Sequence, residues 1–173
     1  DLEVQLTHAR DKVLAGLFHV IETLFNVRLK PDSAPVWHED VRFFRIEAHD
    51  GELIGQFYLD LYARETKRSG AWMDEAITRR SIAGGVQKPV AYLNCNFPRP
   101  VGDKPATFTH DDVITLFHET GHGLHHLLTR GEELGVSGIH GVEWDAVELP
   151  SQFMENYCWE WNVLEQMTAH VET

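Results

Sequence analysis

The sequence predicts an α+β fold in which a small antiparallel sheet from residues 41 to 97 packs on one long helix, with helices at both ends. Apolar residues recur at spacings of three and four over residues 7–25 and 109–129, as on the buried face of an amphipathic helix. Residues 41–48 and 53–62 are rich in β-branched and aromatic side chains. These two patterns, helical at the ends and strand-like between them, predict the fold class.

The strand-like runs flank the tripeptide His49-Asp50-Gly51, and an Asp-Gly pair between two such runs is typical of a β-hairpin. Apolar and polar side chains alternate along residues 53–62, so one face is expected in a core. A third strand is expected at residues 90–97, because Pro89 and Pro98 bound it. Residues 64–80 show no clear pattern.

The helix expected from Thr109 to Thr129 has a start signal, since Thr109 can cap it and two aspartates in its first turn suit the positive end of the helix dipole. Four glycines between Gly131 and Gly141 then predict a mobile loop. A last helix is expected from Asp145 to Ala169, with Pro150 in its first turns.

Composition bounds the function. Residues 1–173 are 43% hydrophobic, enough for a single compact segment, and no apolar run approaches the roughly 20 residues that cross a bilayer. The net charge of −12 disfavours nucleic acid and anionic membranes as partners. We expect no signal peptide, because no basic region followed by an apolar run precedes the first helical pattern. We expect a cytoplasmic location, because Cys95 and Cys158 lie far apart in sequence and form no C-x-x-C pattern. A single disulfide between them remains an open alternative.

The helix at 109–129 contains His118-Glu119-Thr120-Gly121-His122, an H-E-x-x-H motif. Residues four apart on a helix lie about 40° apart around its axis, so His118 and His122 can bind one ion. Zn²⁺ suits this arrangement, and Glu119 beside it would activate the attacking water. The alternative is an ordinary solvated helix, but the capped helical context and the small Gly121 favour the metal site.

The spacing alone leaves the third metal ligand open. His125 is excluded as a partner of His118 because seven residues separate them by roughly 10 Å along the axis. His125 and the next residue, His126, are therefore expected at the periphery of the site or on the surface. Asp145, Glu148 and Glu155 share one face of the last helix and follow a loop long enough to turn back, and Glu148 is the best placed.

The chain resembles the thimet oligopeptidase family. The resemblance is carried by residues 116–126 (LFHETGHGLHH), 136–138 (VSG), 144–156 (WDAVELPSQFMEN), 55–64 (GQFYLDLYAR) and 87–92 (QKPVAY), and covers nearly the whole chain. It implies a central segment of a zincin-like peptidase catalytic domain. It also implies that the Glu before Pro-Ser-Gln, here Glu148, is the third zinc ligand, with Glu119 as general base. We further predict that Asp145 or Glu155 orients one of the ligands.

Three residues depart from the family pattern: Thr120 replaces a Phe, His140 an Asn and Tyr157 a Trp. None of them removes a ligand. Family members are several times longer and supply tyrosine and histidine groups for the transition state from sequence beyond this motif. The resemblance therefore implies either a zinc peptidase that cleaves short peptides, or a fragment that binds zinc and peptide with little turnover.

A peptide deformylase is a third interpretation, because that enzyme also carries H-E-x-x-H, but Cys95 lies in LNCNF rather than in the Glu-Gly-Cys setting that it requires. In zincin-like peptidases a strand beside the metal helix pairs with the extended substrate. Val90–Phe97 and Leu53–Tyr62 are the two candidates for that strand.

Overall fold

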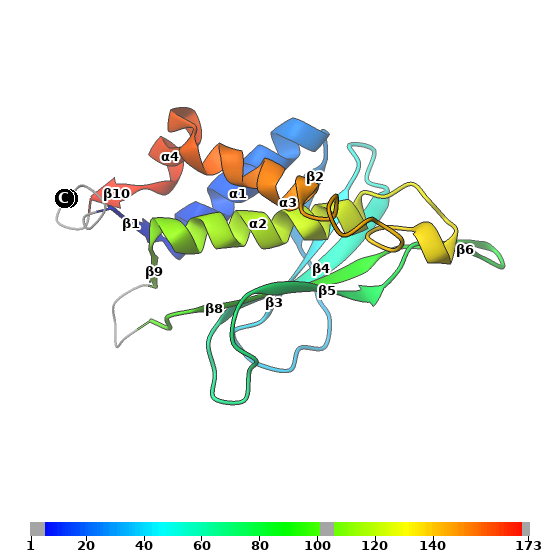
Figure 1. Cartoon of the computed structure of the whole chain (residues 1–173), viewed down its shortest axis with the longest axis horizontal. Helices are drawn as coiled ribbons and strands as arrows, with labels where there is room; N and C mark the ends of the chain where they lie inside the picture. The colour runs from blue at the N-terminus through cyan, green and yellow to red at the C-terminus, as the bar shows by residue number, and fades with distance from the viewer. Residues whose placement is uncertain (1–5, 101–105, 171–173) are drawn as a thin grey trace.

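The computed structural model describes residues 6–100 and 106–170, and its helices lie on one face of a five-stranded sheet (Figure 1). The predicted α+β fold is confirmed. The helices near the two ends of the chain are α1 (Arg10–Phe25) and the shorter α3 (Leu149–Glu155) and α4 (Trp161–Met167). Between them, α2 (His110–Leu127) runs along the sheet.

The sheet has the order β2-β3-β4-β8-β5. Its strands are β2 (Arg28–Pro31), β3 (Arg42–Glu47), β4 (Leu53–Tyr62), β8 (Val90–Phe97) and β5 (Trp72–Ile77). All neighbouring pairs are antiparallel except β4 and β8, which are parallel. The sheet is therefore mixed rather than wholly antiparallel.

The parallel pair follows from the path of the chain. After β4 the chain crosses to the edge and forms β5, then returns through the hairpin of β6 (Arg80–Ile82) and β7 (Gly85–Gln87). It enters β8 antiparallel to β5, and so in the direction of β4. The segment 64–80, which had no clear sequence pattern, thus contains the edge strand β5. A second small sheet joins the ends of the described chain through β1 (Leu6–Ala9), β9 (Thr107–Phe108) and β10 (Ala169–His170).

Local signals set most element boundaries. The hairpin turn is confirmed, since Gly51 takes a φ of 91° between β3 and β4, a conformation that only glycine adopts at no cost. The cap of α2 is confirmed too, because the Thr109 side chain accepts from the Asp112 N–H and the Asp112 side chain accepts from the Thr109 N–H. This reciprocal pair satisfies two of the donors that a helix start leaves open.

The core lies between α1, α2 and the inner face of the sheet. From α2, Val113, Leu116 and Phe117 are fully buried, and Leu59 and Leu93 meet them from the sheet. Burying each such side chain contributes about 1.5–3 kcal/mol. The side of α2 that carries the motif is thereby fixed relative to the sheet.

The prediction of one helix over residues 145–169 is wrong. The chain forms α3, a 3₁₀ turn at Asn156–Trp159, and then α4, with Glu160 extended between them (φ −77°, ψ 122°). The reason is packing: α3 lies on α2, whereas α4 lies on α1, where Met167 closely contacts Gly16. One straight helix cannot reach both partners.

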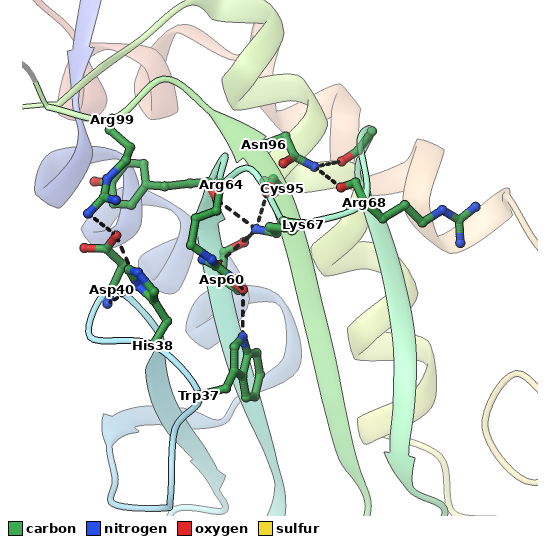
Figure 2. A network of polar contacts seen from close by, with 12 residues as sticks. Trp37, His38, Asp40, Asp60, Arg64, Lys67, Arg68, Cys95, Asn96 and Arg99 are labelled. Atoms are coloured by element: carbon green, nitrogen blue, oxygen red, sulfur yellow. Dashed lines mark hydrogen bonds and ion pairs between the residues drawn. The ribbon is translucent and has the colours of Figure 1, made fainter.

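A buried polar network holds the connection from β4 to β5 (Figure 2). The Lys67 ammonium, whose side chain is only 4% exposed, donates to the backbone carbonyls of Asp60, Tyr62 and Cys95 and pairs with the Asp60 carboxylate at 3.0 Å. Arg64 binds both oxygens of the same carboxylate, at 2.8 and 2.6 Å. The network gathers the ends of β4 and β8 and directs the chain toward β5.

The two cysteines and the lengths of the helices bear on the expected redox state and location. Cys95 and Cys158 are both buried and free, and no disulfide joins them in this structure. Within residues 6–100 and 106–170, the helices are too short or too polar to cross a membrane.

Candidate metal centre

His118, His122 and Glu148 meet at one point. Each offers a ligand atom, and these atoms all lie within 4.8 Å of one another, which sets the three apart among the described residues. Glu148 Oε2 is 3.2 Å from His118 Nε2 and 3.1 Å from His122 Nε2. Ligand atoms around a tetrahedral Zn²⁺ are about 3.4 Å apart, so the geometry and the donor types both fit that ion.

The close approach of α3 to α2 brings Glu148 to the histidines. Gly121 faces the start of α3, and a Cβ there would stand 2.5 Å from both Pro150 O and Ser151 Cα. Only glycine, which has no Cβ, permits this contact. The buried Ser151 hydroxyl then donates to Glu148 Oε2 at 2.8 Å and orients the carboxylate.

A carboxylate on α3 also orients His118. Glu155 Oε1 lies 2.5 Å from His118 Nδ1. Because a carboxylate only accepts, Nδ1 carries the hydrogen and Nε2 presents its lone pair to the cluster. Of the two candidates for this role, Glu155 makes the contact, while Asp145 is exposed.

Glu119 lies next to the cluster and is 7% exposed. Burial raises the pKa of Glu119 above its usual value, and the nearby His118 imidazole and a hydrogen bond from the Met73 backbone N–H offset part of this rise. Met73 belongs to β5, so the edge strand runs past the motif. A carboxylate with a raised pKa is suited to accepting a proton near neutral pH.

The pKa values of His122 and Glu148 are both lowered, which favours a neutral imidazole and an anionic carboxylate. Burial lowers the pKa of His122, which favours the neutral imidazole that metals bind. Burial also acts to raise the pKa of Glu148, but the Ser151 hydroxyl and the two imidazoles outweigh it and hold that pKa below its usual value. His122 therefore presents a neutral nitrogen and Glu148 an anionic oxygen.

Several sequence expectations need correction or completion. His126, expected at the periphery or surface, is fully buried and hydrogen-bonds Ile77 O. Both strands named as candidates for substrate pairing, β4 and β8, are interior strands with neighbours on each side, and β5 is the edge strand beside the motif.

Cys95 lies on β8 outside the cluster, which speaks against the deformylase interpretation. The sequence prediction did not include Ser151, although a Ser three residues after a ligand candidate was a usable signal.

Known proteins share this segment. The sequence model of peptidase family M3 matches residues 4–173. The chain is 60% identical over 165 residues to oligopeptidase A of Escherichia coli K12 (94% of this chain, 24% of the relative). It is 53% identical over 175 residues to oligopeptidase A of Haemophilus influenzae (100% and 26%) and 32% identical over 179 residues to saccharolysin of Saccharomyces cerevisiae (94% and 24%).

The chain thus spans about a quarter of the length of these relatives. The match nevertheless includes every residue of the cluster, its orienting neighbours and the edge strand. The resemblance stated from the motifs is confirmed, and the chain belongs to peptidase family M3.

Proposed function

We propose that this chain is the zinc-binding segment of a metallopeptidase catalytic domain that hydrolyses short peptides. The observation that carries the proposal is the convergence of His118, His122 and Glu148 beside a buried Glu119. Two imidazoles and one carboxylate leave one tetrahedral position open, as in catalytic zinc sites. Bound zinc would supply Lewis acidity that polarises the peptide carbonyl and lowers the pKa of a water.

The chain's own residues do the remaining work. Glu119 takes the proton from the attacking water and returns it to the leaving amine, and its raised pKa suits both transfers. Glu155 keeps the His118 ring in one orientation through the 2.5 Å contact, and Ser151 does the same for Glu148. Reaction of water with the carbonyl carbon breaks the C–N bond without a covalent enzyme intermediate.

The topology of the sheet supports β5 as the strand that pairs with substrate. β5 is an edge strand whose Met73 reaches Glu119, and an extended peptide can pair with such an edge while its scissile bond faces the motif. Short, unfolded peptides fit this mode because pairing needs an extended backbone. We expect no nucleic-acid or membrane partner, and a cytoplasmic location in keeping with two unpaired cysteines.

A second candidate function is zinc and peptide binding with little turnover. This candidate applies to residues 1–173 taken by themselves, since they span about a quarter of the relatives' length and groups that stabilise the oxyanion can lie outside that segment. Loss of one such donor costs about 10² to 10³ in rate.

A quenched fluorescent peptide, with zinc measured on the same sample, tests the proposal. Zinc-dependent cleavage that Glu119→Gln abolishes while zinc is retained supports the peptidase. Zinc and peptide binding without cleavage supports the binding segment. Failure to bind zinc at all contradicts both.

A further inference from the structure

A second group of metal-ligating side chains lies one helical turn beyond His122. Glu75 comes from β5, His126 from α2 and His140 from the glycine-rich loop. Glu75 Oε2 is 2.8 Å from His140 Nε2 and 3.7 Å from His126 Nδ1, and it also accepts from Thr78 Oγ1 at 2.8 Å. Three elements distant in sequence thus point imidazole and carboxylate groups at one place.

His126 is the informative member of this group. Its side chain is 0% exposed, and its Nε2 lies 2.9 Å from Ile77 O. A carbonyl only accepts, so Nε2 carries the hydrogen and, in a neutral ring, Nδ1 carries the lone pair. Nδ1 is buried without a hydrogen-bond partner among the described residues. The buried Nδ1 lone pair and the Glu75 carboxylate oxygen are two acceptors 3.7 Å apart, an arrangement that a cation stabilises.

We propose that His126 Nδ1, the Glu75 carboxylate and His140 Nε2 form a second site for a divalent transition-metal ion, distinct from the His118 centre. Two imidazoles and a carboxylate are a ligand set that Zn²⁺ accepts. The hydrogen bond from His126 Nε2 to a backbone carbonyl is the outer contact that metal-bound histidines usually make.

The site is less complete than the His118 centre, since its three ligand atoms do not all fall within 4.8 Å. Ligand atoms on tetrahedral zinc are about 3.4 Å apart, so the 3.7 Å pair already fits and the 2.8 Å pair must open slightly. To complete the site, the His140 side chain must move toward His126, and it has room to do so because it is 44% exposed. Gly138 and Gly141 flank it with φ of 67° and 73°, so this backbone can adjust.

Gly138 also keeps the space beside His126 open, because a Cβ there would stand 2.6 Å from Nδ1. An ion at this place would join β5, α2 and the loop that leads to Glu148. The second site would therefore stiffen the connection between the edge strand and the third residue of the His118 cluster. This inference concerns metal binding alone and does not require that the chain hydrolyse peptides.

The test is a zinc titration of the chelator-stripped chain at neutral pH, with metal per chain measured by mass spectrometry after dialysis. The wild-type chain is expected to hold two zinc ions. His140→Asn and Glu75→Gln should each hold one, with affinity for the second ion lowered at least tenfold. His122→Ala should also hold one, now at the second site. The control His19→Asn, which removes an exposed imidazole on α1, should hold two.

If Glu75→Gln disturbs folding, the zinc content of His140→Asn tests the second site by itself. This variant is expected to fold, because His140 is on the surface and Asn is the usual residue there in the family that the chain resembles. One zinc per wild-type chain that is lost in His122→Ala would overturn the second site and leave the His118 centre intact. Two zinc ions in both His140→Asn and Glu75→Gln would place the additional ion elsewhere and equally overturn the proposal.

Discussion

Gly121→Ala is expected to weaken zinc binding although it changes no ligand. Its Cβ would stand 2.5 Å from Pro150 O and from Ser151 Cα, both of them backbone atoms that cannot rotate away. Ordinary contact needs about 3.5 Å, so α3 must move by about 1 Å. Metal–ligand distances tolerate only about 0.2 Å, and Glu148 lies next to the displaced segment. We therefore expect the affinity for zinc to fall by about 10- to 100-fold.

The effect on stability combines two opposed contributions. Ala at an interior helix position is better than Gly by about 1 kcal/mol. Overpacking costs about 1–3 kcal/mol, so the metal-free chain should lose from about 0 to 2 kcal/mol in free energy of unfolding. Zinc affinity, measured by competition with a chelating dye, should thus change more than stability, measured by urea unfolding.

Gly135→Ala is the matched control, because a Cβ at this position would meet nothing within 4 Å and the φ of Gly135 is not positive. It should leave zinc affinity unchanged. A Gly121→Ala chain with zinc affinity within twofold of wild type would show that α3 is not held against α2 by this contact, and would refute the reasoning.

Three further substitutions test the site and its support. His122→Ala should remove the zinc of the His118 centre, seen as one fewer equivalent by metal analysis; full retention would contradict its role as ligand. Glu119→Gln should keep that zinc and reduce peptide hydrolysis by orders of magnitude, in a chain that contains the whole catalytic domain if necessary. Lys67→Met should cost about 3–5 kcal/mol in urea unfolding, because it leaves Asp60 and three carbonyls short of a buried partner, whereas exposed Lys12→Met should cost under about 0.5 kcal/mol. A loss below about 1 kcal/mol for Lys67→Met would mean that water replaces the ammonium.

Features set by local geometry were predictable from the sequence. The periodicity of α1 and α2, the Thr109 cap and the Asp50-Gly51 turn depend on residues within a few positions of one another, and the structure confirms them. The bounds of β8 match the expected range because Pro89 and Pro98 flank it, and those of β4 match the range over which apolar and polar side chains alternate. The pairing of His118 with His122 follows from helix geometry alone, since residues four apart share a face.

Features that depend on contacts between distant segments were decided by tertiary structure. Spacing did not separate Asp145, Glu148 and Glu155, because all three fell on one face of the single helix that the sequence predicted. Resemblance selected Glu148, and the close packing at Gly121 brings it to the histidines while Glu155 reaches His118. The role of these residues as metal ligands or orienting groups stays a prediction.

The edge position of β5, the break between α3 and α4 and the burial of His126 had no local signal either. Each depends on which surfaces meet after the chain has turned back on itself. A sequence pattern reports the face that a residue occupies on its own element, and only the packed structure reports what lies opposite that face.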